Sequence, residues 1–201
     1  YIGGLRRHYP HGSIIYAGKA SLTQAVCRII EEEGLCLDVV SGGELFTALS
    51  AGFPPERIFF HGNNKSLDEI ACGIKVGVHR FVVDNLYELE MLETEAAREQ
   101  TTANVLLRIA PGVEAHTHSY LRTGQVDSKF GFGLEDGRAL EAIEVILQSP
   151  HLRLLGLHAH IGSQIFEVES YRLTTRIMVS FIGHLRSSLG VSIEELNLGG
   201  G

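Results

Sequence analysis

Short apolar runs recur along the chain, and most of them are followed by a segment whose apolar residues return every three or four positions. The runs are nearly continuous, which is typical of parallel strands covered on both faces, whereas half-exposed strands alternate. The pattern predicts strands over residues 13–17, 35–40, 58–61, 80–83, 105–109, 154–159 and 195–198.

The intervening segments have the spacing of amphipathic helices. After the first strand, Leu22, Val26, Ile29 and Ile30 fall on one helical face. A later helix has a capping-box signature at its start, because Glu69 follows Ser66 by three residues. Helices are predicted over residues 22–33, 44–52, 66–77, 85–100, 134–148 and 171–189.

Strands that alternate with helices predict an α/β fold with a parallel sheet. A TIM-type (β/α)8 barrel has eight strands and usually needs about 250 residues. The 201 residues here, with seven predicted strands, favour such a barrel truncated to about seven strands, and an open doubly wound sheet is the alternative. We therefore expect residues 1–201 to form one partial barrel domain of a longer protein, since the chain starts at Tyr1 and stops at Gly201.

The charge balance narrows the function classes. The chain has 17 Lys and Arg residues against 24 Asp and Glu residues, a formal net charge of −7, and it contains no basic run. This argues against binding to nucleic acid or to an anionic membrane surface. The three cysteines show no C-x-x-C spacing, so we expect reduced thiols in a cytoplasmic protein.

Active sites of βα barrels gather at the carboxyl ends of the strands. Lys19 stands there, and a desolvated lysine can form a Schiff base, although a solvated loop lysine is the plainer reading. Gly199–Gly201 follow the last strand and either cradle a phosphate or form a tight turn. Arg108 and Asp38 lie within apolar runs, where a charge needs an opposite charge from a ligand or from the protein.

Histidines leave a second class of function open. We expect one of His158 and His160 to face the barrel interior and the other to pack outward. His116 and His118 lie in a long irregular stretch, residues 110–132, where two such residues can chelate a metal. No carboxylate pattern accompanies them, so we expect no metal site, but a metal-dependent barrel hydrolase remains the alternative.

Seven motifs stand in order along the chain: Tyr16-Ala-Gly-Lys19-Ala, Asp38-Val-Val-Ser-Gly-Gly-Glu44-Leu, His61-Gly-Asn-Asn-Lys65-Ser, Arg108-Ile-Ala-Pro-Gly, Lys129-Phe-Gly, His158-Ala-His160-Ile-Gly-Ser163-Gln and Leu198-Gly-Gly-Gly201. Together they resemble the diaminopimelate decarboxylases, pyridoxal-phosphate enzymes of the group IV decarboxylase family with an alanine-racemase-like barrel. The resemblance runs across nearly the whole chain.

The resemblance implies a role for each matching residue. Lys19 matches the lysine that holds pyridoxal 5'-phosphate covalently, and His160 matches the histidine stacked on the cofactor ring. Asp38 and Arg108 match polar residues of the cofactor pocket. The phosphate-binding positions of the family are matched by Ser163, Gly199, Gly200 and Gly201.

The implied reaction is decarboxylation of meso-2,6-diaminopimelate to L-lysine and CO2, the last step of lysine biosynthesis, in a cytoplasmic homodimer. Decarboxylation of ornithine, arginine or carboxynorspermidine on the same fold is the nearest alternative. In the family, the acidic partner of the pyridine nitrogen comes after the last motif, and the substrate-reading residues come from a C-terminal β-domain. We therefore expect residues 1–201 alone to be inactive and to expose the strand edges of an unclosed barrel.

Overall fold

The computed structural model describes residues 2–112, 130–163 and 165–200. The chain divides into two compact units, Tyr1–Phe81 and Val82–Gly201, and the boundary falls inside strand β4 (Arg80–Val83). Each unit is described by itself below.

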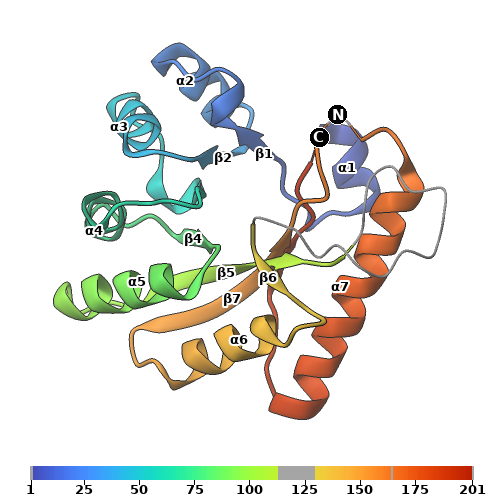
Figure 1. The fold of residues 1–201 in the computed structure, drawn as a ribbon. Coiled ribbons are helices and arrows are strands. Elements are labelled where there is room, and N and C mark those ends of the chain that lie inside the picture. Colours follow the sequence, from blue (N-terminus) through green and yellow to red (C-terminus); the bar gives the residue numbers. More distant parts are fainter. Residues whose placement is uncertain (1, 113–129, 164, 201) are drawn as a thin grey trace. The chain divides into compact units, whose positions relative to one another are not determined.

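The first unit is a run of parallel strands joined by helices. Its elements are α1 (Ile2–His8), β1 (Ile15–Ala17), η1 (Gly18–Ala20), α2 (Gln24–Glu32), β2 (Cys36–Val39), α3 (Gly42–Ser50), η2 (Pro55–Arg57), β3 (Ile58–Phe60), α4 (Leu67–Lys75) and the start of β4. Strands β1 to β4 pair in chain order, all parallel, so each crossover carries its helix to the same side. Figure 1 shows α2, α3 and α4 following one another along that side.

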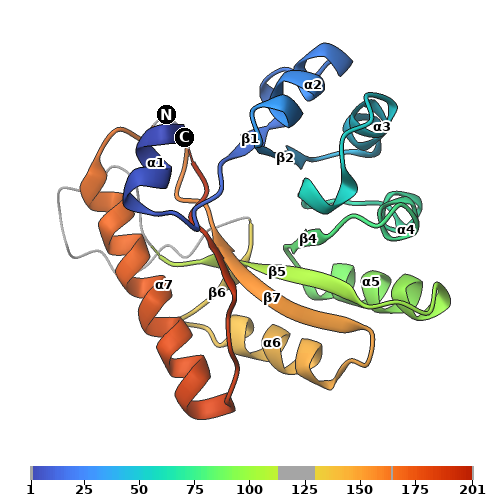
Figure 2. The same ribbon diagram turned by 180° about the vertical axis from the view of Figure 1, so that it is seen from behind.

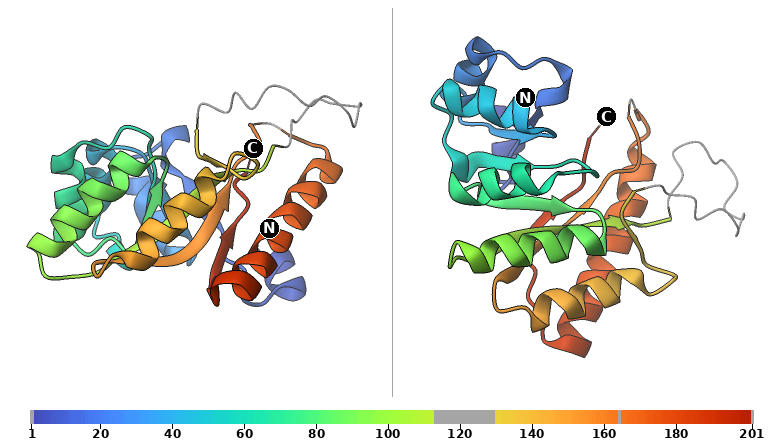
Figure 3. Two further views of the ribbon diagram at one scale, coloured as in Figure 1. Left: turned by 60° about the horizontal axis from the view of Figure 1, so that its bottom comes forward. Right: turned by 60° about the vertical axis from the view of Figure 1, so that its left-hand side comes forward.

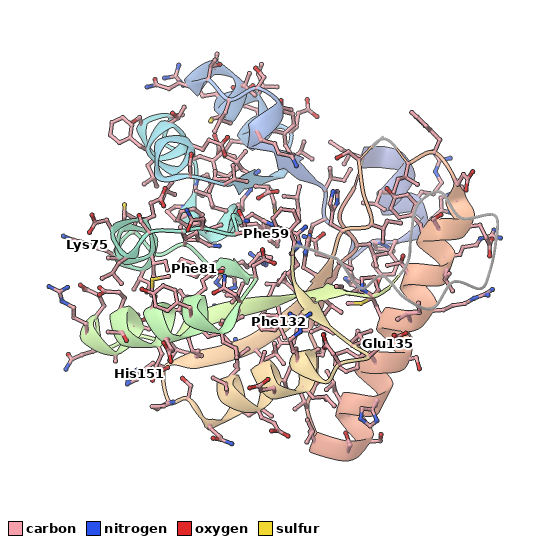
Figure 4. The ribbon with its side chains drawn as sticks, in the orientation of Figure 1. Phe59, Lys75, Phe81, Phe132, Glu135 and His151 are labelled. Carbon is pink, nitrogen blue, oxygen red and sulfur yellow. The ribbon has the colours of Figure 1, made fainter. Side chains whose placement is uncertain are left out.

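The two faces of this sheet differ in chemistry. Val39, Phe60 and Phe81 lie in register on one face, all of them buried, and Gly73 of α4 packs directly on the two phenylalanine rings. Phe81 is labelled beneath α4 in Figure 4. The neighbouring register row contains Asp38, Phe59 and Arg80, and Arg80 stacks over the Phe59 ring at 4.7 Å. The helices therefore cover an apolar face, and the other face carries charge.

The second unit follows the same plan around longer strands. Its elements after β4 are α5 (Leu86–Arg98), β5 (Ala103–Ala110), β6 (Phe132–Gly133), α6 (Arg138–Gln148), β7 (Leu152–Ala159), α7 (Val168–Leu189) and β8 (Glu195–Asn197). Strand β5 pairs in parallel with β6 and with β7, and β7 pairs in parallel with β8. Figure 2 shows β7 alongside β5 from behind, and Figure 3 shows α6 lying against β7.

The structure confirms all seven predicted strands, with ends that differ by up to two residues, and all six predicted helices. Four elements were missed: helix α1, the short turns η1 and η2, and strand β6, which brings the strands of the described residues to eight. The predicted capping box of α4 is present, with Ser66 Oγ accepting from the Glu69 N–H and Glu69 Oε2 accepting from the Ser66 N–H. Most of the irregular stretch 110–132, including His116 and His118, lies outside the described residues. Among the described helices, none is long and apolar enough to cross a membrane.

Candidate functional site

Lys19 lies at the carboxyl end of β1, in the short η1 turn, and its side chain is exposed. The turn is pressed against the neighbouring strand, because Ala17 pairs with Asp38 and a Cβ atom on Gly18 would come within 2.7 Å of the Asp38 carbonyl oxygen. Only glycine fits before the lysine at this approach. The local backbone therefore fixes where the Lys19 side chain leaves the strand end.

Asp38 is accompanied by a histidine from the next strand end. His61 Nε2 lies 3.9 Å from Asp38 Oδ1, and the two side chains are 12% and 20% exposed, respectively. The end of β2 is held by the following helix, since the Val40 N–H donates to Glu44 Oε2 at 2.7 Å and Ser41 caps α3. Strand β2 thus presents the Asp38 carboxylate from a rigid position on the strand next to β1.

Arg108 belongs to a polar row across the second unit. Arg108 of β5 is in register with His158 of β7, which is in register with Asn197 of β8, so the three positions share one face of the sheet. Asp84, just beyond β4, places its Oδ1 3.9 Å from Arg108 Nε. The sequence predicted that a buried arginine here needs an anion or a carboxylate, and Asp84 supplies the carboxylate.

His158 lies in β7 and His160 directly follows the strand, and the two were expected to face opposite sides of the sheet. That expectation is wrong, because residues two apart along a strand share a face. His158 is 3% exposed, whereas His160 follows the last residue of β7 and is half-buried. Burial, together with the nearby Arg108 and His160 side chains, lowers the pKa of His158 from 6.5 to about 3. His158 is therefore a neutral imidazole, and His160 is the one available at the strand end.

Gly199 lies directly against His160. Its φ is +68°, and a Cβ atom there would come within 2.7 Å of the Ala159 carbonyl oxygen and 2.8 Å of His160 Nδ1. The Gly199 N–H donates to Asn197 Oδ1 at 2.8 Å, and a Cβ atom on Gly200 would meet no described atom within 4 Å. This backbone, bare of side chains beside a half-buried imidazole, fits the phosphate and ring of a pyridoxal cofactor.

The predicted site residues fall into two groups. Lys19 and Asp38 belong to the first unit, and the second unit holds Arg108, His160, Ser163, Gly199 and Gly200. Within the second unit the structure brings His160 and Gly199 into contact, whereas Ser163 is exposed just beyond β7. Gly201 lies outside the described residues.

Sequence reasoning assigned no role to the side chains that contact the predicted residues. These side chains are His61, Asp84, Phe130 and Asn197. Their positions at strand ends, and the Lys129-Phe-Gly motif, were the available signals. The apolar, helical surroundings of Cys27 and Cys72 in the sequence predict that both lie in the core. Cys27 is buried, whereas Cys72 is exposed, so the prediction for Cys72 is wrong. No group of three or more histidine, cysteine, aspartate or glutamate residues in the described part of the chain is arranged to hold a metal.

Comparison with known proteins identifies the family. Residues 4–201 match the model described as pyridoxal-dependent decarboxylase, pyridoxal binding domain. The chain belongs to the pyridoxal-dependent decarboxylases. It is 51% identical to the diaminopimelate decarboxylase of Bacillus subtilis and 50% identical to that of Halalkalibacterium halodurans, in each case over 188 residues. These matches cover 94% of this chain and 43% of each relative, so the chain spans less than half the length of either relative.

A solved relative shows the same fold for this decarboxylase domain. The diaminopimelate decarboxylase of M. jannaschii, crystallised with L-lysine, superposes with a TM-score of 0.88 at 36% identity. The match covers 99% of this chain and 46% of that one. The predicted fold class, an α/β fold of the alanine-racemase-like (β/α) barrel type, is confirmed.

Proposed function

We propose that the protein carrying this chain decarboxylates meso-2,6-diaminopimelate to L-lysine and CO2 with pyridoxal 5'-phosphate. The observation that carries the proposal is the 51% identity to a diaminopimelate decarboxylase over 94% of the chain. The L-lysine in the solved relative is the product expected of this reaction and supports the same substrate class.

Each residue of the site has a proposed task. Lys19 would hold the cofactor covalently through its Nζ atom and, when released, would move a proton at the substrate. His160 presents its ring to the cofactor, and Gly199–Gly201 with Ser163 bind the phosphate. Asp38 contributes a carboxylate and Arg108 a guanidinium to cofactor binding. When bound, pyridoxal phosphate supplies an electron sink for the pair left by the departing CO2.

Several contacts in the structure suit these tasks. Gly18 allows the chain to pass close to β2, so Lys19 leaves the strand end from a fixed point. Gly199 has no side chain to separate the phosphate-binding backbone from His160. Asp84 compensates the charge of Arg108, which offsets the cost of placing a guanidinium on a partly buried sheet face.

Borohydride trapping tests the cofactor assignment. The full-length protein is incubated with pyridoxal phosphate, reduced, digested, and its pyridoxyl-peptide is mapped by mass spectrometry. We expect the label on Lys19 and its loss in Lys19→Ala. Lys65 and Lys75 are internal controls: the first is buried with Nζ donating to the Gly62 carbonyl, and the second is exposed on the outer side of α4 (Figure 4). A folded protein labelled equally at all lysines refutes the assignment.

The substrate is tested separately by following CO2 and L-lysine release from meso-diaminopimelate. Ornithine and arginine serve as competing substrates, and a preference for either of them refutes the proposed specificity while leaving the cofactor assignment intact. We also propose a homodimer in the cytoplasm, and light scattering of the full-length protein tests the dimer.

A further inference from the structure

The guanidinium of Arg108 has neighbours on two sides. Asp84 Oδ1 lies 3.9 Å from its Nε atom, and the carboxylate is only 6% exposed, so the ion pair is poorly screened by water. The ring of Phe130 lies on another side, with the Arg108 Cζ atom 4.9 Å from the ring centroid. That distance is within the range of a cation–π interaction.

Phe130 is held in this place by the next residue. Gly131 has a φ of +86°, and a Cβ atom there would come within 2.8 Å of the Arg108 carbonyl oxygen and 3.2 Å of Arg108 Cγ. No other residue type fits, because the conformation is left-handed and the backbone of β5 is too close. The next residue, Phe132, begins β6, which pairs with β5 through Ile109 and Phe132. Strand β6 thus anchors the Phe130-Gly131 pair on the strand that carries Arg108.

We propose that Phe130 is a positioning residue that orients the Arg108 guanidinium toward the cofactor. The inference rests on the proposed function, because it assumes that Arg108 serves the cofactor pocket. Phe130 closes one side of the guanidinium while Asp84 attracts its Nε edge, which leaves the remaining N–H donors to face a ligand. Fixing the long arginine side chain before the ligand arrives removes part of the entropy cost of binding.

The inference is tested with a double-mutant cycle in the full-length protein. The variants are Phe130→Leu, Phe130→Tyr, Arg108→Gln and Phe130→Leu with Arg108→Gln. Phe46→Leu is the matched control, because Phe46 is a phenylalanine on α3 with 71% of its surface exposed. For each variant we measure the dissociation constant for pyridoxal phosphate by absorbance titration, kcat and KM for meso-diaminopimelate, and the far-ultraviolet circular dichroism spectrum.

We expect Phe130→Leu to weaken cofactor binding by about two- to tenfold, the range that a cation–π contact spans. We expect kcat to fall by a similar factor with little change in KM. Phe130→Tyr keeps the ring and should retain most of the cofactor affinity and of kcat. Phe46→Leu should change neither. In the Arg108→Gln background, Phe130→Leu should add almost nothing, because the group that it positions is absent.

Three results overturn the inference while the proposed function stands. One is a Phe130→Leu effect of equal size in both backgrounds, which means general packing. Another is no effect of Phe130→Leu in the parent protein, and the third is no effect of Arg108→Gln on cofactor affinity or kcat. If Phe130→Leu does not fold, Phe130→Met repeats the cycle with a longer apolar side chain. Absence of pyridoxal phosphate binding by the unmutated protein refutes the proposed function, and the inference with it.

Discussion

Acidification should destabilise the fold through His158, because burial disfavours the protonated form of its imidazole. The folded pKa is about 3, against 6.5 for an ordinary histidine. Between these values the unfolded chain binds a proton that the folded chain does not, so stability falls as the pH falls. Above pH 6.5 the imidazole is neutral in both states and contributes no pH dependence.

The magnitude follows from the two pKa values. Each pH unit between them costs about 1.4 kcal/mol, so lowering the pH from 7 to 5 should remove about 2 kcal/mol of stability through this residue alone. The loss should level off only near pH 3. A cost of this size is a substantial share of the roughly 5–15 kcal/mol that stabilises a typical protein.

Urea unfolding followed by circular dichroism at pH 7, 6 and 5 measures the effect in the full-length protein and in His158→Gln. The variant has no titrating group at this position and should lose about 2 kcal/mol less than the parent over that range. His184→Gln, which removes an exposed imidazole from α7, is the control and should retain the parent's pH dependence.

Equal pH dependence in the parent and in His158→Gln would refute the reasoning. If that variant does not fold, nitrogen-15 correlation spectra of the histidine rings give a direct reading in the unmutated protein. The chain has 10 histidines, and the ring of His158 should remain neutral at pH 5. A His158 ring that gains a proton between pH 6 and 7 would contradict the assignment.

Three further predictions concern single substitutions, and the two glycine substitutions are each compared with the same substitution at an uncrowded glycine. Gly73→Ala places a methyl group 3.0 Å from the buried Phe81 ring, whereas a methyl group at Gly183 meets nothing within 4 Å. Both substitutions gain the same helix propensity, so the crowding should make Gly73→Ala less stable than Gly183→Ala by about 1–3 kcal/mol in thermal unfolding. Equal stabilities would refute the packing argument. Glu69→Gln removes a carboxylate that accepts from the Ser66 and Gly42 N–H groups, and these hydrogen bonds hold the pKa of Glu69 below its usual value. The substitution should lower the free energy of unfolding by about 1–2 kcal/mol at pH 7 and by progressively less below pH 4.5, where the parent protein loses the same stabilisation. An unchanged urea midpoint at pH 7 would contradict this. Gly199→Ala should weaken pyridoxal phosphate binding by at least about tenfold, because the new methyl group displaces His160. Gly200→Ala should weaken binding less, because its Cβ atom meets open space. The reverse order of affinities in absorbance titrations would refute the role of the Gly199–His160 contact.

The order of strands and helices was predictable because both periodicities are strong in this sequence. Strand β6 was missed because it is two residues long and follows glycine, which leaves no run from which a period can be read. Helix α1 was missed because Gly3 and Gly4 are poor helix formers and its seven residues show no apolar stripe.

The positions of the site residues at strand ends could be predicted, but the side chains that contact them could not. Parallel strands place their carboxyl ends together, so Lys19 and His160 could be identified as strand-end residues from the sequence alone. The Arg108–Asp84 pair and the Phe130 contact depend on which strands are neighbours and on their register. Neither follows from local pattern, because register is a property of the assembled sheet.

One local device does connect sequence to site geometry in both units. After β2, the Val40 N–H donates to Glu44 Oε2, and after β4, the Asp84 N–H donates to Glu88 Oε2. In each case the glutamate stands in the first turn of the next helix, three residues after its Ser41 or Asn85 cap. The carboxylate therefore ties the helix start to the last N–H of the strand end, where it also complements the helix dipole.

This device explains why charged residues at these strand ends can be held in place. Asp84 is the residue whose own N–H is tied to Glu88, and its side chain meets Arg108. Replacing Glu88 by glutamine would leave one N–H donor without its charged acceptor in a buried place, since Glu88 is 2% exposed. The strand-end backbone would then relax, and the Asp84 carboxylate would lose its fixed distance to the Arg108 guanidinium. A spacing of four residues between strand end and glutamate is thus a sequence signature of a rigid strand end, and rigidity there is what a site built from several strands needs.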